Sequence, residues 1–366
     1  MNPEQLKTRI KKIRSAMSLQ KIDALTVTSP VNVTYLTAFS GDDSWAIITP
    51  RQVYLITDSR YTIQAQKESF GPKLCRIIQR KGPLTQAAQK ILSRSKSIET
   101  VGVENTITIA LFDRLKKLLT PAVKKTNNLV ESVRTYKDPG EIAAIRIAAK
   151  IAQAALENIT DNIKPDLTEN QLAALLDLQI RWLGSYPSFE TIVAFGPNAA
   201  RPHHRPGSRK LKKNDTILID FGATHKGYRS DLTRCFAVGK VSRFYAKVYK
   251  ALWHAQQTAI EAVLPGADPN SVDLAAKNVL KKYNLPLYGH GTGHGLGLQV
   301  HEAPIVSGGA PKKSTLEPGQ VITIEPGVYL PGKFGIRIED DILITKTGAK
   351  VLSKKTSTEK VTVLTF

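Results

Sequence analysis

Four carboxylates lie beside strongly apolar stretches that are typical of β-strands. Burying an ionised carboxylate costs several kcal/mol unless it is paired with a cation or bound to a metal. Four such residues in apolar surroundings therefore predict a cation at a shared site. The stretches are TILIDFGATHKGYRSDLTRCFAV (216–238), which contains Asp220 and Asp231, VITIEPGVYL (321–330), which contains Glu325, and GIRIEDDILIT (335–345), which contains Glu339.

Arginine or a metal could supply this cation. Arg229, Arg234 and Arg337 are close in sequence to the carboxylates. For four carboxylates together with the histidine-rich stretch GHGTGHGLGLQVHE (289–302), a metal cluster is the better explanation. Oxygen-rich ligation with one or two imidazoles favours Mn, Co, Zn or Fe. Four carboxylates can neutralise two divalent ions, at the ~3.5–4 Å separation that is typical of two-metal hydrolases.

The histidine-rich stretch contains His290, His294 and His301. It could be a metal site, a phosphate-binding loop or a flexible turn. Its glycine spacing matches neither a P-loop nor a dinucleotide fingerprint. The stretch alone does not identify which histidine is functional.

Two predicted hairpins position the carboxylates. One turns near residues 225–227 and places Asp220 and Asp231 on neighbouring strands; the other turns near 331–333, with Glu325 and Glu339 on its two arms. Two helices precede each strand region, and their order predicts two similar halves facing each other with the site between them. The helices are expected at 141–163, at 168–183 behind a capping box of Thr168 and Gln171, at 243–264 and at 271–283.

The first third of the chain has the pattern of a separate α/β unit. An amphipathic helix is followed by short β-rich stretches and a further helix. A Pro-Gly break at 139–140 marks a change of pattern. We therefore expect an α/β N-terminal domain at 1–135 and a second domain at 136–366.

The composition indicates an ordinary globular protein of 366 residues, with a net charge of +21. The basic residues are scattered and no nucleic-acid motif accompanies them, so we expect a basic solvated surface rather than a nucleic-acid partner. No apolar stretch approaches the ~20 residues of a membrane span. Two distant cysteines and a charged N-terminus without an export signal favour the cytoplasm.

Several stretches resemble the pita-bread metallopeptidases (M24), the family of Xaa-Pro aminopeptidases, prolidases and methionine aminopeptidases. The N-terminal part resembles the creatinase/prolidase N-terminal domain. The resemblance implies an α+β pita-bread catalytic domain with pseudo-two-fold halves. It rests on PHH (202–204), DFGATHKGYRSDLTR (220–234), GTGHGLGLQVHEAP (291–304), TIEPGVY (323–329), GIRIEDD (335–341), NVTYLTAFSG (32–41) and LITDSRYTIQA (55–65).

The resemblance implies a ligand set for two divalent ions, with manganese expected first and cobalt, zinc or iron as alternatives. Asp220 would bind one ion, Asp231 and Glu339 would bridge both, and His294 and Glu325 would complete the second. A water held between the ions would lose a proton and attack the scissile carbonyl. Glu325 would handle the proton.

Two further histidines would contact the substrate without binding metal. By the resemblance, His203 and His301 would hydrogen-bond the substrate and the tetrahedral oxyanion. We expect His204 to line the entrance without a role, and His290 to support the site. Arg337 would either anchor a ligand carboxylate or hold the substrate terminus. The glycines of 289–302 would give a metal and a peptide backbone room to approach.

The large N-terminal domain disfavours a methionine aminopeptidase, and the intact ligand set disfavours creatinase. Cleavage before proline remains, with peptides that carry proline at the second position as substrates. Ile305, where several prolidase-like relatives carry Arg, favours an aminopeptidase over a dipeptidase, although the basic residues of 201–213 could bind a dipeptide carboxylate. A homodimer is expected, in which Asp42 or Asp43 reaches the partner's site. A pseudoenzyme used for binding is the remote alternative.

Overall fold

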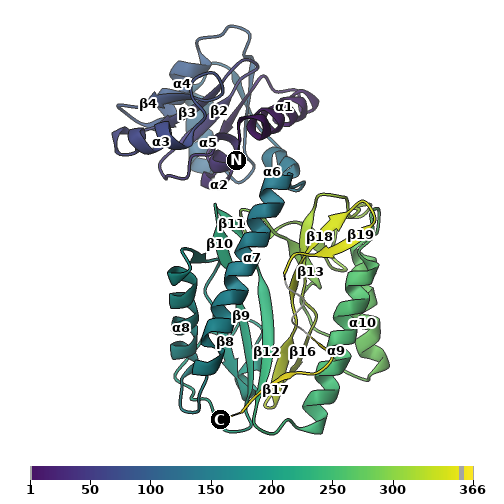
Figure 1. Ribbon diagram of the computed structural model, residues 1–366. Helices are drawn as coiled ribbons and strands as arrows, with labels where there is room; N and C mark the ends of the chain where they lie inside the picture. The colour runs from purple at the N-terminus through teal and green to yellow at the C-terminus, as the bar shows by residue number, and fades with distance from the viewer. Residues whose placement is uncertain (1, 354–357, 366) are drawn as a thin grey trace. The chain divides into compact units, whose positions relative to one another are not determined.

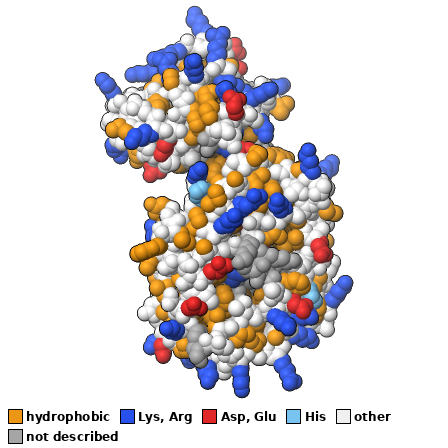
Figure 2. Space-filling view, in the orientation of Figure 1, with side chains coloured by type: hydrophobic (Ala, Val, Ile, Leu, Met, Phe, Trp, Pro, Cys, Tyr) orange, Lys and Arg blue, Asp and Glu red, His pale blue; other side chains and the backbone are white. Residues whose placement is uncertain are grey.

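The computed structural model describes residues 2–353 and 358–365. The chain divides into two compact units, Met1–Arg134 and Thr135–Phe366. Cys75 and Cys235 are buried free thiols. Among the described residues, no helix has the length and apolar character that crossing a membrane requires. Figure 2 shows Lys and Arg side chains spread over the visible face of both units, in agreement with the expected basic surface.

The N-terminal unit is built on a six-stranded mixed sheet in the order β4-β3-β2-β1-β5-β6. Helix α1 begins behind a capping box of Asn2 and Gln5. The predicted α/β character is confirmed (Figure 1). The elements are α1 Pro3–Leu19, β1 Ala24–Val27, α2 Pro30–Thr37, β2 Trp45–Ile48, β3 Val53–Thr57, η1 Ser59–Tyr61, α3 Thr62–Glu68, β4 Arg76–Gln79, α4 Leu84–Leu92, β5 Thr100–Val103, α5 Ile109–Leu118, β6 Ala122–Lys125 and α6 Leu129–Arg134.

The second unit contains the predicted order of two helices followed by strands, twice. Its first half consists of α7 Pro139–Ile159, η2 Thr160–Asn162, α8 Glu169–Trp182, β7 Tyr186–Pro187, β8 Ile192–Phe195, η3 Gly196–Ala200, β9 Thr216–Phe221, β10 Ala223–His225, β11 Tyr228–Arg229 and β12 Leu232–Val238. Its second half consists of α9 Arg243–Ala262, α10 Pro269–Lys282, β13 Gly293–Gly295, β14 Glu302–Val306, β15 Val321–Ile324, β16 Gly327–Leu330, β17 Phe334–Arg337, β18 Asp340–Thr345 and β19 Gly348–Val351, and β20 Thr362–Leu364 follows.

Each half buries its helices against its own strands. Figure 1 shows α7 and α8 on one flank of the strands and α9 and α10 on the other. One sheet runs β20-β12-β9-β8 and the other β14-β13-β15-β18-β19. One apolar cluster lies within the first half and includes Leu364 of β20, whereas the other joins the second half to Ala194, Ala199, Leu218 and Cys235 of the first. The two sheets meet where Thr233 forms a β-bridge with Glu339.

Both predicted turns are present. Lys226 and Gly227 have φ values of 52° and 82°, as a two-residue type I′ hairpin between β10 and β11 requires. The second turn joins β16 and β17, where Lys333 N–H donates to Leu330 O. The expected arms are not continuous strands, however. The chain leaves regular strand structure at Glu325, between β15 and β16, and at Glu339, between β17 and β18.

Candidate metal centre

The strand ends bring the predicted ligands of both halves together. Asp220 lies on β9 opposite Thr233 of β12, and Asp231 directly precedes β12. Glu339 N–H donates to Thr233 O at 3.3 Å. The interruptions at the two glutamates therefore place carboxylates where the sheets converge.

Three of the predicted ligands form a compact donor group. One ligand atom each of Asp231, His294 and Glu339 lies within 4.8 Å of the other two. His294 Nε2 is 3.7 Å from Asp231 Oδ2 and 3.3 Å from Glu325 Oε1. A carboxylate-rich set with one imidazole suits a divalent transition metal.

The ring of His294 is oriented for metal binding through Nε2. Its Nδ1 lies 3.1 Å from Gly295 O, an acceptor, so in the neutral ring the proton belongs on Nδ1. The Nε2 lone pair is then directed toward the carboxylates. Fixing the tautomer through the other ring nitrogen is common among metal-binding histidines.

Asp220 is held by an arginine and retains one oxygen for a cation. Arg337 Nη2 donates to Asp220 Oδ2 at 2.5 Å, and the arginine side chain is 4% exposed. Asp220 Oδ1 is buried and has no hydrogen-bond partner among the described residues. A buried carboxylate oxygen without a donor fits a metal ligand better than a purely structural ion pair.

The site carries more negative charge than it can neutralise by itself. Burial, and then the charges of Glu339, Asp220 and Glu325, raise the pKa of Asp231 well above its usual range. Burial and the charges of Glu325 and Asp220 do the same to the pKa of Glu339. Burial also acts on Glu325, but its hydrogen bond to His294 and the charge of that ring lower its pKa. A divalent cation would relieve this repulsion.

Arg337 connects several of the ligands through hydrogen bonds. Its Nε donates to Thr233 Oγ1 at 3.0 Å, and that hydroxyl donates to Glu339 Oε2 at 2.6 Å. Its Nη1 donates to the Tyr329 hydroxyl at 3.0 Å and to Pro202 O at 3.3 Å. These contacts are those of an anchor for Asp220 and, through Thr233, for Glu339; the second role considered for Arg337, holding the substrate terminus, stays a prediction. Neither Thr233 nor Tyr329 was expected at the site from the sequence.

The two histidines expected to contact substrate lie beside the ligands. The rings of His301 and His294 are 4.4 Å apart between centroids, in an edge-to-face arrangement. Burial and then the charge of His294 lower the pKa of His301. His203 is exposed, and its charge contributes to lowering the pKa of both Asp220 and His301.

His290 supports the site, as expected. Its Nδ1 lies 2.7 Å from Gly291 O and its Nε2 3.0 Å from the Tyr329 hydroxyl. The expectation for His204 was wrong, because it is buried instead of lining an entrance. Its Nε2 is 2.8 Å from Glu169 Oε2. Glu169 also accepts hydrogen bonds from Phe195 N, Asn198 Nδ2 and Gly207 N.

Asp340 and Asp341 support the site and were missed from the sequence. Asp341 accepts from the backbone N–H of Asp231, while Asp340 pairs with Arg234 at 2.7 Å. Both directly follow Glu339 in the apolar stretch GIRIEDDILIT, and that proximity is the signal that could have drawn attention to them.

Close packing by neighbouring strands explains why positions 293 and 295 of β13 are glycine. A Cβ on Gly293 would lie 1.9 Å from Thr323 O, and one on Gly295 would lie 2.1 Å from Ala303 O. The neighbouring strands, rather than a metal or a peptide, therefore exclude a side chain from these positions.

Comparison with known proteins agrees with this geometry. Residues 143–346 match metallopeptidase family M24, and residues 9–136 match the creatinase/prolidase N-terminal domain. The chain is 32% identical to the Xaa-Pro dipeptidase of Pyrococcus furiosus over 95% of this chain and 98% of that protein. It superposes on a Xaa-Pro dipeptidase from Bacillus anthracis with TM-score 0.92 at 32% identity, covering 98% and 100% of the two chains.

A third relative is named for a different activity. The X-Pro aminopeptidase of Thermotoga maritima superposes with TM-score 0.88 at 31% identity, covering 96% of this chain and all of that one. The chain thus belongs to metallopeptidase family M24, with a creatinase-type N-terminal domain and a pita-bread catalytic domain. It is a metallopeptidase.

Proposed function

We propose that this chain hydrolyses the peptide bond that precedes proline at the second position of a peptide, and that it uses two divalent metal ions. The observation that carries the proposal is the convergence of the buried Asp231 and Glu339 with the partly buried His294, with Asp220 and Glu325 beside them. Manganese is the first candidate metal, because oxygen donors outnumber nitrogen donors.

Different residues of the site would carry out different parts of the hydrolysis. Bound divalent ions would supply Lewis acidity, both to activate a water and to polarise the scissile carbonyl. Glu325, whose Oε1 lies 3.3 Å from His294 Nε2, is the candidate to accept a proton as the water attacks. His203 and His301 are the candidates for hydrogen bonds to the substrate and to the oxyanion. Arg337 keeps Asp220 in position.

We propose that the preferred substrates are peptides longer than dipeptides. A dipeptidase gains selectivity from a basic group that binds the carboxylate of the terminal proline. Ile305, on β14 opposite His294, supplies no charge there and is 49% exposed. A longer substrate needs no such group.

Dipeptide hydrolysis is the second candidate. Two of the relatives described above are named Xaa-Pro dipeptidases. Basic residues in 201–213 offer an alternative cation for a substrate carboxylate. A homodimer in the cytoplasm is the setting that we propose for either activity.

A comparison of substrate lengths tests both candidates. The protein is freed of metal, reconstituted with Mn²⁺, and given a Xaa-Pro-Yaa tripeptide and the matching Xaa-Pro dipeptide. The proposal predicts a higher kcat/KM for the tripeptide, and the reverse order would establish the dipeptidase alternative. If neither substrate is cut with Mn, Co or Zn, the enzyme proposal fails and a binding role becomes the better explanation.

A further inference from the structure

A buried ion pair outside the ligand set connects the start of α7 to the histidine-rich stretch. Lys137 Nζ lies 3.2 Å from Glu302 Oε2, and the two side chains are 1% and 7% exposed. The partners are 165 residues apart in sequence. Neither residue belongs to the candidate metal ligands.

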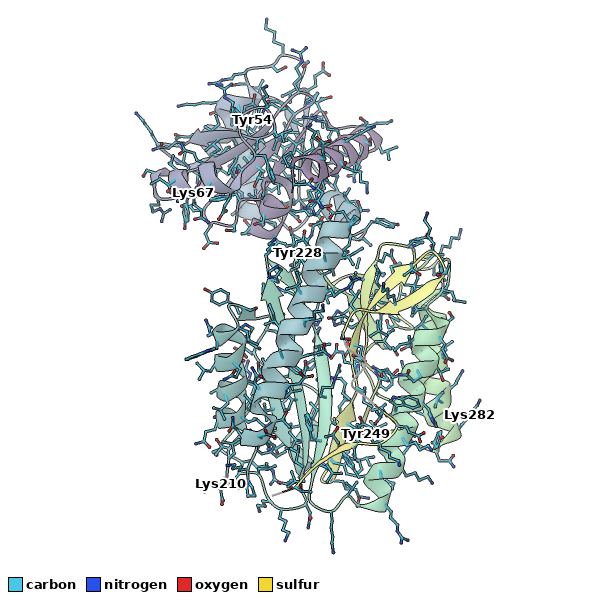
Figure 3. The ribbon with its side chains drawn as sticks, viewed as in Figure 1. Tyr54, Lys67, Lys210, Tyr228, Tyr249 and Lys282 are labelled. Atoms are coloured by element: carbon cyan, nitrogen blue, oxygen red, sulfur yellow. The ribbon has the colours of Figure 1, made fainter. Side chains whose placement is uncertain are left out.

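Lys137 projects from a firmly held part of the backbone. Its N–H donates to Gly319 O at 2.8 Å. The next residue, Asp138, caps α7 and forms a capping box with Glu141. Glu141 in turn accepts a 2.9 Å hydrogen bond from the Tyr228 hydroxyl, and Figure 3 shows Tyr228 beside the start of α7. The lysine ammonium therefore extends from a fixed point.

Glu302 holds the loop that carries His301. Its Oε1 accepts from Gln299 N–H at 2.9 Å. A Cβ on Gly297 would lie 2.8 Å from Glu302 Oε2, so the loop is folded closely around this carboxylate. Gly297 N–H also donates to Gln299 O. His301 directly precedes the glutamate, and its ring lies against His294.

The carboxylate can occupy this enclosed position only with a cation beside it. Without Lys137, the carboxylate of Glu302 would turn toward water and release its hydrogen bond to the loop. We propose that Lys137 is a positioning residue: through Glu302, it fixes the 296–302 loop and thereby the place of His301 beside the metal ligands. The proposal builds on the proposed function, in which His301 contacts the substrate.

The test compares Lys137→Met with Lys137→Arg and with a matched control. The control is Lys277→Met, which removes another lysine ion pair of the same unit, 2.8 Å from Asp273. For each variant we would measure amide hydrogen exchange of 296–302, bound Mn²⁺, and kcat and KM on a Xaa-Pro-Yaa tripeptide. Exchange reports local opening independently of catalysis.

We expect Lys137→Met to accelerate exchange within 296–302, to keep its Mn²⁺ content and to lower kcat about 10- to 100-fold, with KM changed less than about threefold. Lys137→Arg should restore most of kcat, and Lys277→Met should leave kcat and loop exchange unaltered. Unchanged exchange in Lys137→Met would overturn the proposal, as would faster exchange throughout the unit or lost metal, either of which indicates a general structural role.

The two proposals fail in different ways. If the wild-type protein cuts no Xaa-Pro substrate, the proposed function falls, and the exchange measurement still decides whether Lys137 fixes the loop. If the wild-type protein is active and Lys137→Met keeps both its kcat and its loop protection, only the positioning role falls.

Discussion

Arg337 and Asp220 form a short ion pair, 2.5 Å from Nη2 to Oδ2, in which the arginine is 4% and the aspartate 13% exposed. The pair directs one carboxylate oxygen to the arginine and leaves Oδ1 for a cation. Because the same guanidinium also reaches Thr233, a single cationic side chain positions ligands from both halves of the unit.

Replacing Arg337 by Met should impair both metal binding and folding. Removing one partner of a buried pair typically costs about 3–5 kcal/mol, because the other charge stays uncompensated. We expect the free energy of unfolding of the metal-free protein to fall by about 3 kcal/mol and kcat/KM to fall at least about 100-fold. Urea unfolding and metal analysis measure the two effects. Retention of full metal content and activity would show that Asp220 needs no anchor.

Asp231→Asn should abolish metal binding while the fold is retained. The pKa of Asp231 is raised by burial and by neighbouring carboxylates, so its charge destabilises the metal-free protein. The melting temperature without metal should therefore stay the same or rise. Asp177→Asn is the matched control, since burial raises the pKa of that carboxyl on α8, outside the metal centre. A normal metal content in Asp231→Asn would remove Asp231 from the ligand set.

Metal stabilisation should depend on pH in a defined direction. Asp231, Glu339 and Asp341 have raised pKa values in the folded metal-free protein, mainly through burial. Such groups add stability below their unfolded pKa of about 4, and this stability is lost as pH rises through the folded pKa. Metal binding requires the ionised carboxylates. The melting-temperature difference between Mn²⁺-loaded and metal-free protein should thus widen from pH 5.5 to 7.5, and a constant difference would contradict this.

Glu169→Ala should destabilise the segment that carries His203. The carboxylate of Glu169 accepts from two backbone amides, from Asn198 and from His204. Leaving buried donors unsatisfied costs about 1–3 kcal/mol each. We expect a loss of at least about 2 kcal/mol in urea unfolding, with a smaller loss for Glu169→Gln. Equal stability of the alanine variant and the wild type would refute this role.

The candidate metal ligands could be selected from the sequence because an ionised side chain within an apolar stretch is costly to bury without a cation. Asp220 and Glu339 stand out in this way, and the family resemblance supplied His294. The contacts that support these residues could not be predicted from the sequence in the same way. Glu169 with His204, and Glu302 with Lys137, pair across 35 and 165 residues, and no local pattern indicates which charges will meet. His204 was misjudged for that reason.

The fold was predictable to a similar degree. The helices of the second unit and the capping box of Thr168 and Gln171 follow from apolar spacing and from side-chain hydrogen bonding. The strand interruption at Glu325 could have been inferred from Pro326-Gly327, which directly follow it, whereas the interruption at Glu339 has no proline or glycine beside it. The carboxylates leave the regular strand pattern in order to converge with the ligands of the other half.

The close packing of strand β13 limits which positions near the metal centre can be substituted. At Gly293 and Gly295 any side chain would collide with the backbone of a neighbouring strand. The two positions next to His294 therefore accept almost no substitution. The adjacent strand β14 presents Ile305 to solvent. Libraries that aim to alter substrate choice should therefore vary the exposed Ile305 of β14 and leave β13 and Glu302 unchanged, because Ile305 is neither a candidate metal ligand nor a support of the His301 loop.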